Sequence, residues 1–176
     1  MQRLVLHCAA LLLLACNAQA QVLLKAPPNV VAIDARLTTS GQPSAAWLET
    51  LGSRSIEAVI YLAPLSVDDA VPDEPQILKR QGIEFEHIPI AFNQPTGADF
   101  DRFAAAMTRL QERKVLVHCQ VNMRASSMVF LYRAIVLKED PQSAFDAVEK
   151  VWIPSGVWQR FIAAQLKEHA IVFDPF

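Results

Sequence analysis

The chain has 176 residues, and 52% of them are hydrophobic, which suits one domain with a single substantial core. The 16 Lys and Arg residues nearly balance the 18 Asp and Glu residues. This composition argues against a disordered chain and against a basic surface that binds nucleic acid or an anionic membrane.

Residues 1–20 have the pattern of a secretory signal peptide. Arg3 gives a positive start, residues 4–15 form an apolar stretch too short to span a bilayer comfortably, and a small-x-small motif ends at Ala20. We expect cleavage after Ala20, which leaves residues 21–176 as one domain in the periplasm or outside the cell. The weaker alternative is an uncleaved amino-terminal helix.

A second alternative concerns Cys16, which ends the sequence LLAC. This sequence is an imperfect lipobox, and lipidation of Cys16 would anchor the protein to a membrane. Because Cys8 and Cys16 both lie in the leader, only Cys119 remains in the mature chain, and no internal disulfide is possible. A lone thiol outside the cytoplasm is either buried or retained for its chemistry.

Apolar periodicity and turn residues predict strands that alternate with helices along the mature chain. The predicted order is a strand at 29–33, a turn at 38–43, a helix at 44–51, a strand at 58–62, a loop at 63–72, a helix at 73–81, a strand at 83–90, a helix at 96–113, a strand at 115–117, and helices at 124–137, 141–151 and 156–169. Residues 171–176 remain unassigned. This alternation predicts an α/β fold with a central, mostly parallel sheet flanked by helices.

The sequence VLVHCQVNMRAS places His118 and Cys119 at the carboxyl end of a predicted strand, just before a helix. Functional sites in open α/β folds lie at such ends. Arg124 can offer a planar fork to an oxyanion, and the helix amino terminus adds positive potential that favours a thiolate at Cys119. The oxyanion would also be held by the backbone N–H groups of the intervening residues, which are Gln120, Val121, Asn122 and Met123. Asn122 is suited to a left-handed backbone conformation in this loop.

This loop resembles the signature H-C-x5-R-[ST] of cysteine-dependent protein tyrosine and dual-specificity phosphatases. The wider chain is similar to small bacterial phosphatase-like domains, including those of beta-lactamase-hydrolase-like proteins. The similarity covers residues 29–162 through LTTSGQPS, AVIYLAP, HIPIAF, PTGADFDRF, VHCQVNMRASSMVFLYR and VWIPSGVWQRFI. It implies that Cys119 attacks a phosphate monoester and that Arg124 holds the phosphate oxygens. Phosphorylated proteins, with phosphotyrosine as one option, and small phosphate esters are the implied substrates.

Two further residues of the loop region receive roles from the resemblance and from their position. His118 is expected to orient the loop by hydrogen bonding, and Ser126 is expected to assist hydrolysis of a phosphocysteine intermediate. Ser127 is a second hydroxyl that could donate to the thiolate. No metal-ligand spacing is recognisable, and no cofactor is expected. The sequence does not indicate an oligomeric state.

The loop departs from the phosphatase pattern because four residues, rather than the usual five, separate Cys119 from Arg124. Aligned without a gap, Asn122 stands on the usual glycine, Ala125 on the usual arginine and Ser126 on the usual serine. Aligned with a gap, the loop is one residue shorter than in the main group of phosphatases.

The general acid is the second departure. An acid that protonates the leaving oxygen is expected near HIPIAF, where Ala91 stands instead. The nearest carboxylates are Asp99 and Asp101, and we take Asp99 as the candidate acid. An alternative role for Asp99 is a capping box with Thr96 at the start of the helix. Asp68 and Asp69 belong to a loop that we expect to be solvated.

Three other functions or roles stay open for Cys119. Rhodaneses have a C-x4-R loop of the length found here, which makes sulfur transfer the first alternative. A catalytically weak module that binds oxyanions or phosphopeptides is the second. The third is a cysteine that only packs in the core, although the adjacent histidine and the following arginine argue for chemistry.

Overall fold

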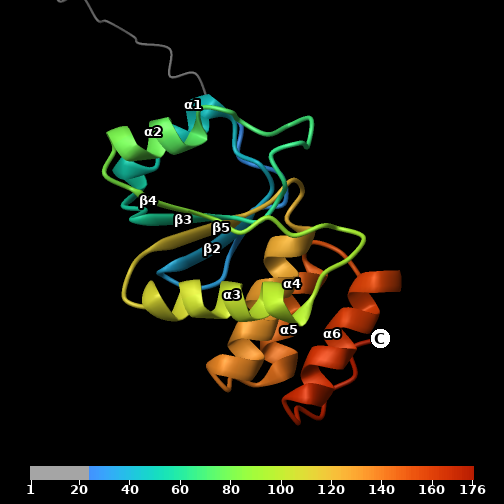
Figure 1. The fold of residues 1–176 in the computed structure, drawn as a ribbon. Coiled ribbons are helices and arrows are strands. Elements are labelled where there is room, and N and C mark those ends of the chain that lie inside the picture. The colour runs from blue at the N-terminus through green and yellow to red at the C-terminus, as the bar shows by residue number, and fades with distance from the viewer. Residues whose placement is uncertain (1–23) are drawn as a thin grey trace, which may run out of the picture.

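The computed structural model describes residues 24–176, so the predicted signal peptide and Cys16 lie outside the described residues. The domain is built around a five-stranded sheet (Figure 1). In spatial order the strands are β1 (Val31–Ala32), β2 (Leu37–Ser40), β5 (Val115–His118), β3 (Ala58–Tyr61) and β4 (Glu84–His87). All neighbours pair in parallel except β1 and β2. The predicted α/β fold with a mostly parallel sheet is confirmed.

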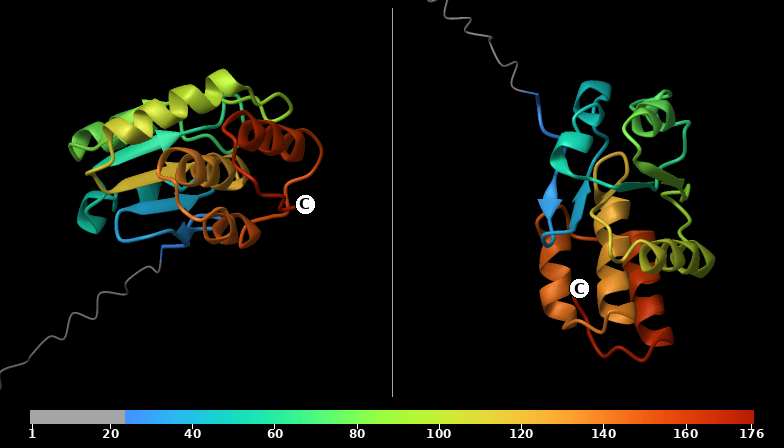
Figure 2. Two further views of the ribbon diagram at one scale, coloured as in Figure 1. Left: turned by 90° about the horizontal axis from the view of Figure 1, so that it is seen from below. Right: turned by 90° about the vertical axis from the view of Figure 1, so that its left-hand side faces the viewer.

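Helices cover both faces of this sheet (Figure 2). One face carries α1 (Ala45–Leu48) and α2 (Glu74–Arg80). The other face carries α3 (Gly97–Arg109), α4 (Met123–Leu131), α5 (Pro141–Glu149) and α6 (Gly156–Glu168). The chain also forms a short 3₁₀ turn, η1 (Gly52–Arg54), and a π-helical turn, η2 (Tyr132–Val136).

The apolar sequence of β5 explains why both faces are covered. Val115 and Val117 belong to the core beneath α3 and α4, whereas Leu116 belongs to the core beneath α1 and α2. Successive side chains of a strand point to opposite faces, so a strand that is buried on both sides reads as an uninterrupted aliphatic run. This run carries the chain directly to His118 and Cys119.

The turn predicted at residues 38–43 is wrong in its first half, because Leu37–Ser40 forms β2 in the interior of the sheet. Thr39 and Ser40 are fully buried, which their polarity does not predict. Parallel pairing with β5 satisfies their backbone groups, and this tertiary contact outweighs the local turn preference of Thr and Ser.

Other boundaries differ from the prediction mainly at element ends. The helix predicted at 44–51 is only α1, which Ser44 caps by accepting a hydrogen bond from the Trp47 backbone. The strand predicted at 83–90 is shorter in the structure, where β4 covers Glu84–His87. The helix predicted at 96–113 is α3, which ends at Arg109. The helix predicted at 124–137 begins as α4 and becomes η2, since apolar periodicity alone does not distinguish a π turn from an α-helix.

Several local predictions are confirmed by backbone geometry. Helix α2 ends just before Gly82, which has a φ of 70°. Helix α3 begins with the predicted capping box, in which Thr96 and Asp99 exchange hydrogen bonds. The unassigned residues 171–176 form no helix or strand, but Phe173 packs against Phe130 and Phe145, with ring centroids 6.1 and 5.9 Å away.

The parallel register brings the carboxyl ends of four strands to one edge of the sheet. Ser40, His118, Tyr61 and His87 lie on a single rung across β2, β5, β3 and β4. Cys119 is the next residue of the chain, so it lies beyond the carboxyl edge, where the connection to α4 begins.

Candidate active site

Cys119 lies between the end of β5 and the start of α4. Its backbone N–H donates to the Ser40 carbonyl over 3.2 Å, which continues the β2–β5 ladder by one residue. The side chain has an exposed fraction of 0% and belongs to the core cluster that includes Val117. Burial alone fits both a packed core cysteine and a shielded nucleophile, so the surrounding loop has to distinguish these roles.

The loop after Cys119 is held by polar contacts with the amino-terminal part of the domain. Asn122 has a φ of 71°, so the left-handed conformation predicted for it is confirmed. Its side-chain amide donates to the Asn29 carbonyl over 2.6 Å and to the Thr39 hydroxyl over 3.0 Å. These bonds fix the turn that precedes α4 and that orients the loop amides.

Gly41 allows the β2 connection to approach this loop closely. It forms an isolated antiparallel bridge with Val121, and the Gln42 backbone N–H donates to the Gln120 carbonyl over 3.0 Å. A Cβ atom on Gly41 would lie 2.8 Å from the Gln120 carbonyl oxygen, closer than carbon and oxygen tolerate. The glycine in LTTSGQPS is therefore explained by backbone contact with the Cys119 loop.

Arg124 lies in the first turn of α4 and is 5% exposed. Its Nε donates to the Ile90 carbonyl over 3.0 Å, and its guanidinium carbon lies 5.1 Å from the centre of the Phe92 ring. Within residues 24–176, this Nε bond is the one protein hydrogen bond of the guanidinium, which leaves both Nη groups for a planar fork.

An aromatic cluster adjoins Arg124. Phe92 lies 6.0 Å from Trp152 and 5.8 Å from Trp158 by ring centroids, and the Trp158 indole donates to the Phe92 carbonyl over 2.9 Å. Trp158 is fully buried, whereas Phe92 is 38% exposed. The cluster fixes the Phe92 backbone and therefore the ring that covers Arg124.

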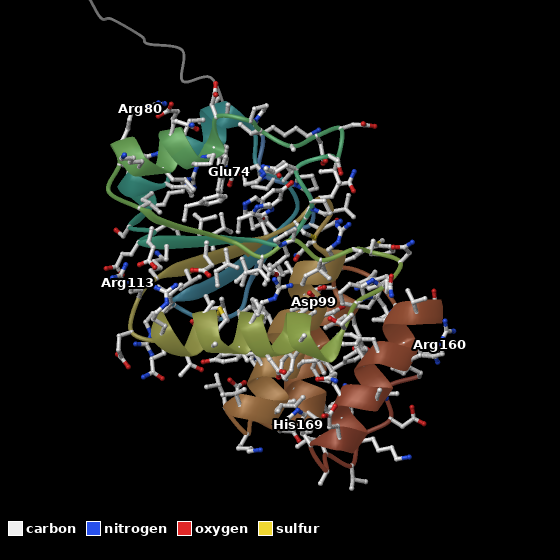
Figure 3. All side chains as sticks on the ribbon, viewed as in Figure 1. Glu74, Arg80, Asp99, Arg113, Arg160 and His169 are labelled. Carbon is white, nitrogen blue, oxygen red and sulfur yellow. The ribbon has the colours of Figure 1, made fainter. Side chains whose placement is uncertain are left out.

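His118 meets a buried carboxylate that the sequence analysis missed. Its Nε2 lies 2.7 Å from Glu74 Oε1, and the exposed fractions of the two side chains are 0% and 2%. Gln42 Nε2 donates to Glu74 Oε2 over 3.0 Å. Glu74 is the first residue of α2, within the helix predicted at residues 73–81. The sequence does not indicate that its side chain points toward the sheet, and Figure 3 shows that it does.

Tyr61 lies between two histidines on the same face of the sheet. Its ring stacks on His118 at 4.6 Å and on His87 at 5.2 Å between centroids, which follows from their common rung. His87 Nε2 lies 2.9 Å from the Ala63 carbonyl. Burial raises the pKa of Tyr61 to about 12, and the charge of Glu74 adds to the shift.

The raised pKa of Tyr61 predicts a loss of stability in alkali. An unfolded tyrosine loses its proton near its ordinary pKa of 10.0, whereas folded Tyr61 keeps the proton to about 12. Between these values the unfolded state binds fewer protons, so the free energy of unfolding falls as pH rises. We expect Tyr61→Phe to remove on the order of 2 kcal/mol of this decline. Urea titrations across this pH window would measure it, with Tyr132→Phe as the control; equal declines in Tyr61→Phe and the unaltered protein would contradict the assignment.

The two serines of α4 lie close to the loop but bond within the helix. The hydroxyls of Ser126 and Ser127 both donate to the Met123 carbonyl, over 3.2 and 2.8 Å. The structure therefore places Ser126 beside the loop carbonyl, and its role in hydrolysis stays a prediction. Ala125 is buried in the core and has no polar side chain to offer, so Arg124 is the guanidinium that the loop presents.

Asp99 has its side chain engaged at the start of α3. Its Oδ2 accepts hydrogen bonds from the Thr96 backbone and hydroxyl, over 2.9 and 2.7 Å, and its Oδ1 lies 2.6 Å from Arg102 Nη2. Figure 3 shows it on the α3 side of the sheet, opposite Glu74. The capping role is thus confirmed, while service as a general acid would require release from these partners. Asp68 and Asp69 are exposed, as expected.

No helix within residues 24–176 has the length and hydrophobicity needed to cross a membrane. The same range contains no group of three or more His, Cys, Asp or Glu side chains placed to hold a metal ion.

Comparisons with known proteins find a matching family model and curated relatives. The family model described as DSP-PTPase phosphatase fused to NAD+ kinase matches residues 27–157. A beta-lactamase hydrolase-like protein of Xylella fastidiosa (strain Temecula1) is 28% identical over 160 residues, which cover 84% of this chain. The match covers 35% of that protein, so the chain spans about a third of the length of this curated relative.

Solved structures share the fold. A DUF442 protein of Shewanella putrefaciens CN-32, provisionally assigned as a phosphatase, aligns with a TM-score of 0.72 and 26% identity over 81% of this chain and 94% of that one. Tk-PTP in its active form aligns with a TM-score of 0.65 and 22% identity over 83% of this chain and 99% of that one. At the latter identity, the likeness describes the fold alone.

Proposed function

Since the chain belongs to the family of DSP-PTPase phosphatases fused to NAD+ kinase and carries their phosphatase-like domain, we propose that it hydrolyses phosphate monoesters through a phosphocysteine intermediate. The observation that carries the proposal is the junction of β5 and α4, where Cys119 and Arg124 flank a loop fixed by left-handed Asn122. The coarser assignment as a phosphoric monoester hydrolase follows from the family.

The proposed reaction has two steps. The Cys119 thiolate attacks phosphorus, a P–S bond forms, and the P–O bond to the leaving group breaks. The Nη groups of Arg124 and the amides of residues 120–123 stabilise the charge on the phosphoryl oxygens. Water then attacks phosphorus, the P–S bond breaks, and inorganic phosphate leaves as the thiolate returns. Ser126 is proposed to assist this second step, and His118 to orient the loop.

The group that protonates the leaving oxygen cannot be the residue at the position that the family resemblance implies. Ala91 lies where the family resemblance implies an acid, and Asp99 is engaged by Thr96 and Arg102. We propose Asp99 as the acid when these contacts open, and otherwise a preference for esters whose leaving group needs no proton. Phosphotyrosine in proteins and small aryl phosphates fit this preference because a phenolate leaves more easily than an alkoxide.

The test is hydrolysis of para-nitrophenyl phosphate by the reduced protein, followed as release of nitrophenolate and inorganic phosphate. The good leaving group means that an absent acid does not mask activity. Cysteine-dependent turnover is expected. Without turnover by folded protein, the proposal fails, and sulfur transfer from thiosulfate to cyanide becomes the function to assay, because the four-residue spacing between Cys119 and Arg124 matches the rhodanese loop.

The amino-terminal sequence supports a further proposal, that the protein is exported. The signal-peptide pattern of residues 1–20 predicts Gln21 as the first residue of protein recovered from a periplasmic extract. Amino-terminal sequencing or intact mass would measure this. A lipid-modified Cys16 would instead indicate a membrane-anchored lipoprotein, and an intact Met1 would contradict export by cleavage.

A further inference from the structure

A cavity of about 170 Å³ lies at the edge of the sheet where β2 and β5 begin, at the opposite end of these strands from Cys119. Leu37 and Val115, the first residues of the two strands, form part of its wall. Arg113 also lines it, and Figure 3 shows this residue near the end of α3 that lies away from Asp99. The cavity is therefore separate from the proposed phosphatase site.

We propose that this cavity is a binding site for a small, neutral aromatic molecule whose polar group hydrogen-bonds to the Tyr132 hydroxyl. Its apolar wall, the available hydroxyl of Tyr132 and the paired charges of its rim together define this class of ligand. The site is independent of the reaction at Cys119, so it stands whether or not the protein hydrolyses phosphate esters.

The wall of the cavity is apolar. Leu37, Met107, Leu110 and Val115 line it, and each is at most 7% exposed. They belong to the core between the sheet and helices α3 and α4, so the cavity is a recess in that core. An apolar cavity of about 150 Å³ can hold a benzene molecule, so this recess has room for one aromatic ring. The thioether of Met107 packs favourably against such a ring.

Tyr132 lines the same cavity and is 2% exposed. No side-chain hydrogen bond within residues 24–176 involves its hydroxyl, yet this hydroxyl is not enclosed in the way that the partnerless Tyr61 hydroxyl is. The Tyr132 oxygen therefore reaches accessible space, and the cavity that this residue lines supplies it. There the hydroxyl can donate a hydrogen bond to a ligand or accept one from it.

Packing alone does not account for a tyrosine at this position. A phenylalanine would keep the edge-on contact of the Tyr132 ring with Phe103, whose ring centroid lies 6.4 Å away. The hydroxyl in an apolar recess carries a desolvation cost unless it finds a hydrogen-bond partner. A ligand with one polar group removes this cost, whereas a purely apolar ligand does not.

The helix that carries Tyr132 changes its conformation at the cavity. Tyr132 begins the π-helical turn η2, and Leu137, which follows this turn, lines the cavity and is 46% exposed. Such π turns are rare and occur frequently at functional sites. The exposure of Leu137 places it at the mouth, where a ligand would enter.

The rim of the cavity carries exposed charged side chains that already have partners. Arg36 pairs with Glu112 at 3.0 Å, and Arg113 pairs with Glu84 at 2.7 Å. Asp34 Oδ1 accepts hydrogen bonds from two backbone N–H groups that follow it in the chain, over 2.6 and 2.8 Å. A charged ligand would compete with these contacts, so the rim favours a neutral one.

Phenol is the probe for this site, because it combines one ring with one hydroxyl and is neutral near pH 7. NMR of the methyl groups of the protein should show saturable shifts at Met107, Leu110 and Leu137 as phenol is added. No saturable shift at these methyl groups with millimolar phenol would overturn the proposal. Shifts confined to residues 119–124 would also overturn it, since phenol would then bind only where the product of an aryl phosphate leaves.

Tyr132→Phe is the decisive variant, because it removes only the hydroxyl. We expect the Kd for phenol to rise roughly fivefold, which corresponds to one hydrogen bond, and the Kd for toluene to stay the same. Tyr61→Phe, which removes a buried hydroxyl elsewhere in the domain, is the matched control and should change neither Kd. Equal phenol affinities for Tyr132→Phe and the unaltered protein would overturn the proposal.

A variant at the mouth tests the location without touching the core. Leu137→Trp enlarges a side chain that is 46% exposed, so the fold should survive while the entrance closes. Loss of both phenol and toluene binding, with an unchanged Tm, is the expected result. Full binding of both probes by this variant would show that they bind elsewhere and would overturn the proposal.

Discussion

Replacing Cys119 by serine is expected to abolish hydrolysis of para-nitrophenyl phosphate, with a loss of at least about 1,000-fold in kcat. Serine occupies nearly the same volume in a site that has an exposed fraction of 0%, so the core should remain packed. A serine hydroxyl stays protonated at neutral pH, and this loop offers no base to remove its proton. The nucleophile is therefore lost while the loop amides and Arg124 persist.

Binding distinguishes loss of chemistry from loss of the site. Calorimetry with inorganic phosphate should give the Cys119→Ser protein a Kd within about threefold of the unaltered protein, because the oxyanion is held by groups that remain. Cys119→Ala serves as the control for any residual attack by the serine oxygen. Turnover by both variants at the rate of the unaltered protein would exclude Cys119 as the nucleophile, and loss of phosphate binding together with lowered Tm would indicate a disturbed loop.

The sequence predicts the local structure of the Cys119 loop well because its determinants are local. An aliphatic strand, a residue that tolerates left-handed backbone and a helix follow one another within one short segment, and Asn122 adopts the expected φ of 71°. The capping box of Thr96 and Asp99 is equally local and equally well predicted. These features depend on residues within a few positions of one another, where pattern and propensity are reliable.

Features that depend on distant partners could not be predicted in the same way. The sequence of β2 predicts a turn, but the segment is a strand because it pairs with β5. Its buried Thr39 accepts a hydrogen bond from the Asn122 side chain. The sequence gives no reason to expect Glu74 to be buried. The packing of α2 on the sheet brings its carboxylate to His118, which is 44 positions away in the chain. Both contacts support the loop that carries the proposed chemistry, so the sequence predicts the local structure of this loop but not the distant residues that hold it.

Arg124→Lys is expected to lower kcat/KM for para-nitrophenyl phosphate by roughly 100-fold while keeping the positive charge. The guanidinium Nε of Arg124 donates to the Ile90 carbonyl over 3.0 Å. In the proposed mechanism, its two Nη groups bind the phosphoryl oxygens. An ammonium has no fork, so it can anchor to Ile90 or reach the phosphate, but it cannot hold both in one fixed plane. The stacked contact with Phe92 also weakens, because a lysine lacks a planar cation.

Steady-state kinetics with Arg160→Lys as the control would test this, since Arg160 is an exposed arginine on α6 and its replacement makes the same chemical change (Figure 3). The control should retain the unaltered rate. If Arg124→Lys also retained it, charge alone would suffice at this position, and the planar fork would not be part of the mechanism. A loss confined to kcat would place the fork in the transition state, where the phosphoryl oxygens spread apart and bidentate geometry has its greatest effect, whereas a rise in KM alone would mean that Arg124 only gathers the substrate.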